Sequence, residues 1–249
     1  MKILKLFFIL SVLLLIGSCS ESLDDIINRN ISARGGKENI SSITTLFSDV
    51  KAKAANYDLN YKIYIEFPDK FRFDMNLLNT NYSTIINNNQ AWIIDDSVAR
   101  VIPPEQIQSI NGEIKQLMLY FLPPVFDYKK KNIKVENLGH DTVNKQKVVK
   151  IKLTFPDMTE ITEYLDIQTY LELKSHYKKN ISGSSAEFDV FFSNYRKVNN
   201  ITIPFSIEVK EGESVLSKIG INSVDINSRF KPTTFKPSKP LAAFEEKGF

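Results

Sequence analysis

The residues that could carry out acid, base or metal chemistry are few and poorly spaced for a shared site. Two carboxylate pairs, Asp24-Asp25 and Asp95-Asp96, could share a proton or a cation, and His140 and His176 could act as bases or ligands. Adjacent residues on a strand point to opposite faces, so a shared carboxylate site is not expected. A metal site needs more ligands at closer spacing than two histidines provide. We therefore predict no catalytic residue, no metal site and no cofactor, and we expect that the protein is not an enzyme.

The start of the chain has the pattern of a secretory signal. Lys2 and Lys5 are followed by an apolar run over residues 6–16 and then by the small residues Gly17 and Ser18. This run is shorter than the ~20 apolar residues that cross a bilayer. A charged start, a short apolar run and a small-residue end are typical of a cleaved signal. We predict a signal peptide over residues 1–18, which the mature chain lacks.

The only cysteine, Cys19, follows this signal directly. The segment Ile16-Gly17-Ser18-Cys19 resembles the lipobox of bacterial lipoproteins, in which the thiol takes a diacylglyceryl group, the signal is cut before it, and the new amino terminus is acylated. Buried acyl chains contribute ~0.8 kcal/mol per methylene, so two or more chains hold a protein stably on a membrane. Cys19 is the predicted lipid attachment site. The alternative is an ordinary signal peptide with a chance cysteine.

Charge and composition limit the partners. The sequence of 249 residues has a formal net charge of +3, and Lys2 and Lys5 leave with the signal, so the mature chain is close to neutral. This balance does not favour nucleic acid or a strong attraction to anionic lipid. The chain has no internal repeat, linker or shift in composition. Residues 19–249 are therefore predicted to be one domain, with a loose tail over about 228–249.

Two stretches have helical periodicity. Ser22-Leu23-Asp24-Asp25 has the form of a capping box, apolar residues then recur at helical spacing, and Gly35-Gly36 ends the helix. A short polar turn is predicted over residues 37–42. The second helix is predicted over residues 104–121, between two proline pairs, with its apolar residues on one stripe. Both helices must cover an apolar surface.

Most of the remaining chain alternates between apolar and polar residues, as strands do. Strands are predicted at residues 44–54, 61–67, 71–77, 82–86, 91–94, 132–137, 147–155, 160–165, 170–177, 186–192, 201–210 and 215–226. Two helices are too few for an α/β fold, whose parallel crossovers need a helix between most strands. We predict a mainly β (α+β) protein, a curved, incomplete antiparallel β-barrel of about 10–11 strands covered by amphipathic α-helices.

Short motifs along the chain resemble the LolA/LolB family of lipoprotein-sorting proteins. In the first half they are Ala33-Arg34-Gly35-Gly36, Phe67-Pro68-Asp69-Lys70-Phe71-Arg72 and Ala91-Trp92-Ile93. In the second half they are Tyr164-Leu165-Asp166, Tyr170-Leu171-Glu172-Leu173, Ile203-Pro204-Phe205 and Phe235-Lys236-Pro237, as in the Bacteroidetes-type lipoproteins of that superfamily. Their order and spacing cover nearly the whole mature chain.

The resemblance implies a barrel with a helical lid over a hydrophobic cavity, which holds the acyl chains of lipoproteins or other lipids without covalent chemistry. In the family the soluble carrier lacks a lipobox and the outer-membrane acceptor has one, so Cys19 makes this chain similar to the acceptor. Ser20 does not signal inner-membrane retention under the proteobacterial sorting rule. The acceptor exposes an apolar residue on a protruding loop early in the barrel, whereas the first hairpin turn here, Pro68-Asp69-Lys70, is polar. This departure argues against membrane-insertion activity of that kind.

Ten side chains from the sheet and the second helix are the predicted cavity lining. They are Phe67, Phe71, Phe73, Met75, Trp92, Ile110, Ile114, Leu117, Met118 and Phe121. Aromatic and methionine side chains suit a wall that adapts to flexible chains. The alternative is that these residues are simply core and fill the space themselves.

The sequence thus predicts a lipoprotein of the cell outer membrane, anchored through Cys19 and facing the periplasm. It would bind acyl chains in a hydrophobic cavity and take part in lipoprotein localisation, with a periplasmic carrier protein as a further partner. The alternative is a binding or sensing module of the envelope on the same fold, with no lipid transfer.

Overall fold

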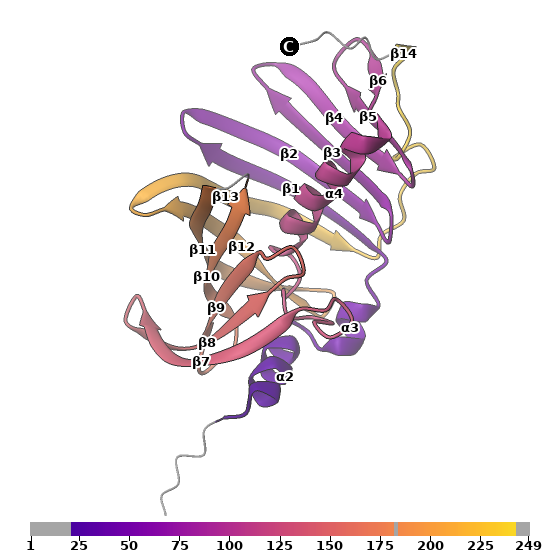
Figure 1. Cartoon of the computed structure of the whole chain (residues 1–249). Helices are drawn as coiled ribbons and strands as arrows, with labels where there is room; N and C mark the ends of the chain where they lie inside the picture. Colours follow the sequence, from indigo (N-terminus) through magenta and orange to yellow (C-terminus); the bar gives the residue numbers. More distant parts are fainter. Residues whose placement is uncertain (1–20, 182–183, 243–249) are drawn as a thin grey trace, which may run out of the picture.

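The computed structural model describes residues 21–181 and 184–242 and is organised around one sheet (Figure 1). The predicted signal peptide and Cys19 lie outside the described residues. The strands are β1 (Thr45–Ala54), β2 (Tyr57–Glu66), β3 (Lys70–Leu77), β4 (Thr80–Asn87), β5 (Gln90–Ile94), β6 (Ala99–Val101), β7 (Lys134–Val143), β8 (Gln146–Thr154), β9 (Glu160–Asp166), β10 (Glu172–Ile181), β11 (Ser184–Val198), β12 (Ile201–Glu211), β13 (Ser214–Ile226) and β14 (Leu241–Ala242). The helices are α2 (Leu23–Ala33), α3 (Lys37–Ser41) and α4 (Pro104–Met118). In this part of the chain no helix has the length and apolar character needed to cross a bilayer.

The sheet has 14 strands in the order β14-β6-β5-β4-β3-β2-β1-β13-β12-β11-β10-β9-β8-β7. Every pair is antiparallel except β14 and β6, which are parallel. The predicted class, a mainly β protein with a curved and incomplete antiparallel barrel, is confirmed. The sheet contains all twelve strands predicted along the chain, more than the 10–11 expected in the barrel, and adds β6 and β14, which are too short to show alternation in the sequence.

The sheet curves without closing, and its two halves differ. Register shifts at Asp49/Val50, Val209/Lys210 and Asn137/Gly139 mark bulges, which bend strands. In Figure 1 strands β1–β6 form a broad, open half, and strands β7–β13 roll into a tighter one. We call these the open half and the rolled half.

Helix α2 begins and ends as its sequence indicates. The Ser22 hydroxyl accepts a hydrogen bond from the Asp25 amide at 3.2 Å. At the other end Gly35 has φ +127°, and a Cβ there would lie 2.4 Å from the Asn200 carbonyl oxygen, so the close approach to the β11–β12 turn requires glycine. The next residues, predicted as a turn, instead form the one-turn helix α3, which is too short for periodicity to reveal.

The two longer helices cover different parts of the sheet. Helix α2 buries Ile26 and Ile27 against the rolled half. Helix α4 crosses the open half (Figure 1). It ends at Met118, three residues earlier than predicted, and the chain continues in turns in which the Phe121 amide donates to the Met118 carbonyl at 3.0 Å.

The described part of the C-terminal tail is not loose. It runs along the outer side of the open half, where Phe235 is 5% exposed and contacts Phe230. Arg72 donates to the Thr234 carbonyl at 3.0 Å, and the Ala99 amide donates to the Pro240 carbonyl at 3.0 Å. Two aromatic anchors and a short parallel strand therefore hold a segment whose proline and lysine content suggested a free arm.

Candidate functional site

The side of β1–β5 that faces α4, here called the inner face, is mostly apolar. On β1–β3, Val50, Ile63 and Phe71 are buried, with at most 7% exposure. Across the same rows of the register the exposure rises toward β4 and β5, to 39% for Tyr82 and 41% for Ile93. The inner face is therefore filled near β1 and left more open toward β4 and β5.

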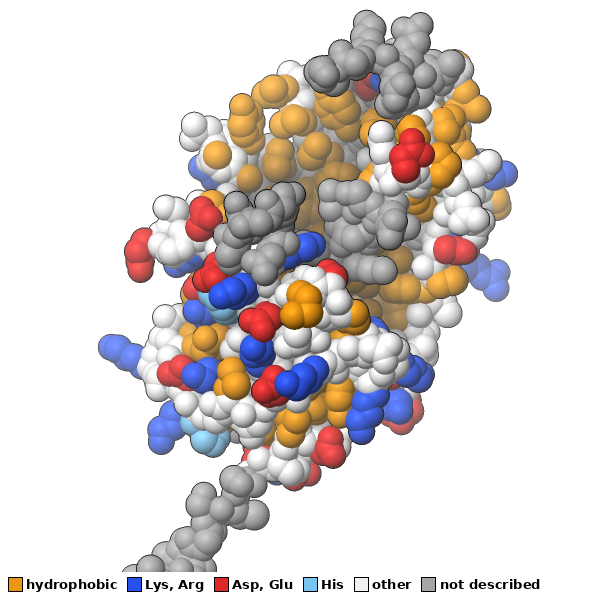
Figure 2. Space-filling model, viewed as in Figure 1, with side chains coloured by type: hydrophobic (Ala, Val, Ile, Leu, Met, Phe, Trp, Pro, Cys, Tyr) orange, Lys and Arg blue, Asp and Glu red, His pale blue; other side chains and the backbone are white. Residues whose placement is uncertain are grey.

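Helix α4 places its apolar stripe against this face. Ile107 is buried, and Ile110, Ile114, Leu117 and Met118 are partly buried against the same cluster of residues. Figure 2 shows hydrophobic side chains gathered over the half of the molecule that β1–β6 form. A partly covered apolar surface of this kind can take up a flexible apolar ligand.

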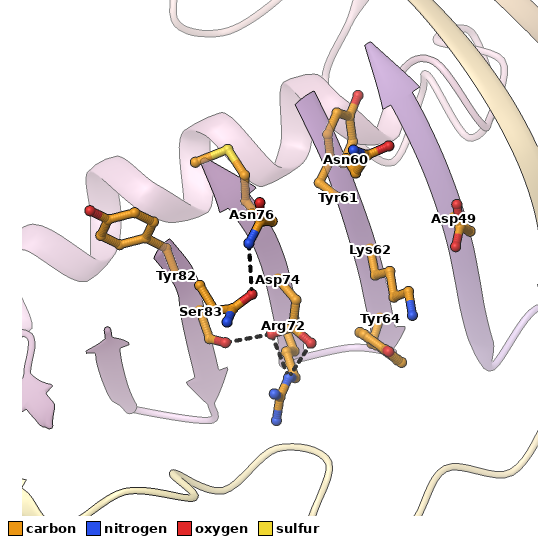
Figure 3. Close-up of a pocket in the computed structure, with 12 residues that line it drawn as sticks. Asp49, Asn60, Tyr61, Lys62, Tyr64, Arg72, Asp74, Asn76, Tyr82 and Ser83 are labelled. Atoms are coloured by element: carbon orange, nitrogen blue, oxygen red, sulfur yellow. Dashed lines mark hydrogen bonds and ion pairs between the residues drawn. The ribbon is translucent and has the colours of Figure 1, made fainter. Parts of the chain in front are cut away.

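A depression of about 440 Å³ lies across β1–β4, with most of its lining on the outer face of the sheet (Figure 3). It is lined by Asp49, Asn60, Tyr61, Lys62, Tyr64, Arg72, Asp74, Met75, Asn76, Asn81, Tyr82 and Ser83. Tyr61, Met75 and Tyr82 are register partners on the inner face, and Lys62, Asp74 and Ser83 form the next row, on the outer face. The outer row is held internally, because Asp74 accepts from Ser83 at 2.6 Å and from Arg72 at 2.8 Å.

Two tyrosines bring hydroxyl groups to the inner face. Burial raises the pKa of Tyr61, and the neighbouring Tyr120 raises it further. Burial also raises the pKa of Tyr120. Neither hydroxyl has a hydrogen-bond partner among the described residues, so both are free to donate to a ligand.

The ten predicted lining residues do not all reach this surface. Phe67, Phe73, Ile110, Ile114, Leu117 and Met118 pack partly exposed against the inner-face cluster, and Met75 lies in the same row as Tyr61. Phe71 and Phe121 are buried at 7% and 2% exposure and are core. The sequence could not distinguish the partly exposed lining residues from the buried core residues, because both groups belong to the same apolar pattern.

Trp92 was predicted to line the cavity, and this assignment is wrong. It packs on the outer side of the sheet with Ile85, Ile94 and Phe235. Its neighbour Ala91 is the residue that belongs to the inner-face cluster. Adjacent residues on a strand face opposite sides, so only one of the two could line the inner face.

A second site, not predicted, lies inside the rolled half. This polar cluster consists of Asn30, Arg34, Glu163, Glu172, Ser175 and Tyr195. The Arg34 guanidinium donates from Nη1 to Glu172 Oε2 at 2.7 Å and from Nη2 to the Phe121 carbonyl at 2.8 Å. Asn30 Nδ2 and Tyr195 Oη both donate to the Glu172 carboxylate, at 3.0 Å each. The cluster thus joins α2, the turn after α4, β10 and β11.

The two glutamates of the polar cluster have opposite pKa shifts. Burial raises the pKa of Glu163 to about 8, and the charge of Glu172 adds to this, although Ser175 donates to Glu163 at 2.6 Å. Burial also disfavours the charged form of Glu172, but Arg34 and Asn30 outweigh it and its pKa is lowered. The Arg34 guanidinium thus donates to Glu172 and acts on Glu163 only through its charge, and Glu163 is the carboxyl group of the two that is neutral at pH 7.

The sequence contains a local signal that Glu163 is buried. Glu163 lies between Ile161 and Leu165 in the alternation of β9, where an apolar residue is expected. All three are at most 1% exposed. A charged residue at an inward position needs a partner, and Arg34 with Glu172 provides a buried charged neighbourhood.

The hairpin turns of the open half differ in polarity. Pro68-Asp69-Lys70 is polar, as the sequence says. Leu78, at the tip of the β3–β4 hairpin, is 76% exposed and has φ +50°. An exposed leucine in a left-handed turn contributes nothing to the core.

Comparisons with known proteins give structural matches only. No protein family model matches the sequence, and no curated protein matches it. A DUF1329 family protein from Desulfovibrio piger ATCC 29098 superposes with a TM-score of 0.57 at 12% identity, covering 87% of this chain and 98% of that one. A LolA superfamily protein from Nitrosomonas europaea gives a TM-score of 0.55 at 10% identity, covering 88% of this chain and 99% of that one.

A domain from Vibrio parahaemolyticus, named for outer membrane lipoprotein sorting, gives a TM-score of 0.53 at 11% identity. The match covers 85% of this chain and 95% of that domain. Identities this low establish a common fold and leave function open. The chain therefore has the fold of the LolA superfamily, and the resemblance inferred from its short motifs is confirmed at the level of the fold.

Proposed function

We propose that this protein is a lipid-anchored lipoprotein of the outer membrane that binds acyl chains between α4 and the inner face of the open half. In this proposal Cys19 carries the anchor, the domain faces the periplasm, and the bound chains belong to lipoproteins or other lipids. The protein receives or holds such chains without catalysis, and a periplasmic carrier would deliver them.

The contrast between the two halves supports this proposal most directly. In the rolled half, Val149, Ile151 and Leu153 of β8 are at most 1% exposed and fill their own space. In the open half, Tyr61, Phe73 and Met75 stay partly exposed beside a helix whose own stripe is only partly buried. A lining of aromatic and methionine side chains adapts to flexible chains.

The free hydroxyls of Tyr61 and Tyr120 add a polar feature to this surface. A thioether-linked diacylglyceryl group has ester carbonyls close to its acyl chains. A buried tyrosine hydroxyl usually finds a hydrogen-bond partner. The two hydroxyls would donate to such carbonyls and favour acyl esters over plain hydrocarbon.

The double variant Leu117→Asp, Met118→Asp tests the proposal. Two carboxylates at the end of α4 would lie against the apolar inner face, where an unpaired charge costs several kcal/mol, so lipid binding is expected to fall by roughly tenfold or more. The measurement is native mass spectrometry and lipid extraction of protein purified from membranes in mild detergent. Circular dichroism reports whether the sheet is intact.

A matched control is the double variant Leu138→Asp, Met158→Asp. These residues are 45% and 68% exposed in the rolled half, so lipid binding is expected to stay unchanged. The proposal fails if the unaltered protein carries no lipid and takes up no added lipopeptide. That result would favour the alternative, a binding or sensing module without lipid transfer.

Replacing Leu78 by glutamate tests the acceptor role separately from binding. Burial of a leucine contributes about 1.5–3 kcal/mol, so delivery of a fluorescent lipopeptide from this protein to vesicles is expected to slow by roughly tenfold. Lipid binding under α4 should not change. Met158→Glu is the control, because Met158 is 68% exposed on a hairpin of the rolled half. Equal delivery by the Leu78 variant and the unaltered protein would exclude a role for this tip.

A further inference from the structure

Three lysines gather on the outer face of the sheet where β1 and β13 pair. Lys51 and Lys53 belong to β1 and Lys218 belongs to β13. Lys53 and Lys218 are direct partners in the register, and Lys51 is the partner of Gly220. Residues two apart on a strand lie on the same face. The three ammonium groups, here called the lysine patch, therefore project from one side of the sheet.

The patch surrounds a depression of about 470 Å³. Its lining is Lys51, Ala52, Lys53, Asp58, Leu59, Asn60, Lys218 and Gly220, which includes three cations and one carboxylate. Gly220 keeps the depression open beside Lys51, because it has no side chain to fill that position. The depression is therefore positively charged and accessible to a phosphate-sized group.

Internal ion pairs do not account for this arrangement. Like charges directly opposite each other across two strands are destabilising, and Lys53 faces Lys218 in this way on β13, although its register partner on β2 is Asp58. In the described part of the chain Lys51 and Lys53 form no ion pair. Lys218 is 65% exposed and contacts Glu208 at 3.2 Å, a carboxylate that Lys210 already contacts at 2.9 Å. An external anion would relieve the repulsion.

Exposed apolar side chains flank the lysine patch at the two adjoining turns. Leu216, after the β12–β13 turn, is 44% exposed and lies two residues before Lys218, on the same face. Tyr57 and Val215, at 51% and 44% exposure, lie beside the same turns but point to the other face. Lysines beside an exposed leucine are typical of a surface that lies in the lipid headgroup region, with ammonium groups at the phosphates.

We infer that the lysine patch and its flanking turns dock on the surface of an anionic phospholipid bilayer, as a membrane contact separate from Cys19. The near-neutral net charge of the mature chain hides this patch, because only the pairing of β1 with β13 brings the three lysines together. The inference does not depend on acyl-chain binding under α4, and the two can fail independently.

Vesicle capture by the full, lipid-anchored protein tests the inference. The protein is placed in phosphatidylcholine nanodiscs, and sedimenting vesicles are added, either of phosphatidylcholine alone or with phosphatidylglycerol. Capture by the phosphatidylglycerol vesicles is expected to be much the stronger. The triple variant Lys51→Gln, Lys53→Gln, Lys218→Gln should weaken it roughly a hundredfold, at about fivefold per lysine. Leu216→Ser should weaken it roughly tenfold.

A second triple variant, Lys37→Gln, Lys130→Gln, Lys134→Gln, removes the same charge from exposed positions elsewhere. This variant should capture vesicles as well as the unaltered protein does. An equal loss of capture in both triple variants would show that net charge alone causes the effect, and would overturn the inference. Absence of capture, or complete release by inorganic phosphate at the vesicle phosphate concentration, would also overturn it. Co-purified lipid, measured in each variant, shows whether the acyl-chain site is intact.

Discussion

Replacing Arg34 by methionine is expected to lower the free energy of unfolding by about 3–5 kcal/mol, because a buried ion pair loses one partner. The Arg34 side chain is 2% exposed and that of Glu172 is 3% exposed, so water cannot compensate the remaining carboxylate. The Phe121 carbonyl also loses its donor. Urea unfolding followed by circular dichroism measures the change.

Arg29→Met is the matched control for this variant. Arg29 pairs with Glu21 at 3.1 Å, but its side chain is 60% exposed, and exposed pairs contribute at most about 1 kcal/mol. Adding Glu172→Gln to the Arg34 variant should recover part of the loss, since no unpaired charge remains. A loss for Arg34→Met as small as that for Arg29→Met would mean that the pair does not hold α2 to β10.

The second large effect is a stability that falls as the pH rises, and Glu163→Gln is expected to abolish it. The folded protein keeps a proton on Glu163 up to a pKa of about 8, whereas the ordinary value is 4.5. The folded state therefore binds more protons than the unfolded state between these values. The free energy of unfolding should fall through this window by roughly 3–5 kcal/mol, at about 1.4 kcal/mol per pKa unit.

Glutamine stays neutral at every pH and can still accept from Ser175, so the variant should be more stable than the unaltered protein at pH 8 and similar at pH 5. Glu172 acts in the opposite sense, because its pKa is lowered and its contribution is lost only as the pH falls below its ordinary range. The difference between the two proteins from pH 5 to pH 8 thus isolates Glu163, because other groups that titrate there are present in both. Glu211→Gln, at an exposed position, should keep the slope. A slope that persists in the Glu163 variant would assign it to another group.

Both predictions concern a cluster that sets the relation between elements far apart in the sequence. Arg34 follows α2, Glu172 begins β10, and Phe121 lies in the turn after α4. The same interactions that stabilise the rolled half therefore also fix where the chain leaves α4. The free energy of unfolding and lipid binding should therefore be measured on the same variants.

The sequence by itself determined the elements and the class of the fold. Alternation with a period of two identified most strands, and the capping residues and Gly35-Gly36 placed the ends of α2, because these signals are local. The same alternation predicted which strand residues are apolar. It could not assign a face to the pair Ala91 and Trp92, since both are apolar and only the position of the strand in the sheet decides which points inward.

Only the tertiary structure decided which residues act together. The pairing of β1 with β13 joins Lys53 to Lys218, and the packing of α2 on the rolled half joins Arg34 to Glu172. The tertiary structure also showed that α2 and α4 cover different halves of the sheet and that Phe235 holds the tail. The physical reason is the same in each case. These contacts join residues far apart in the chain, so they depend on register and packing, which no local pattern of residues contains.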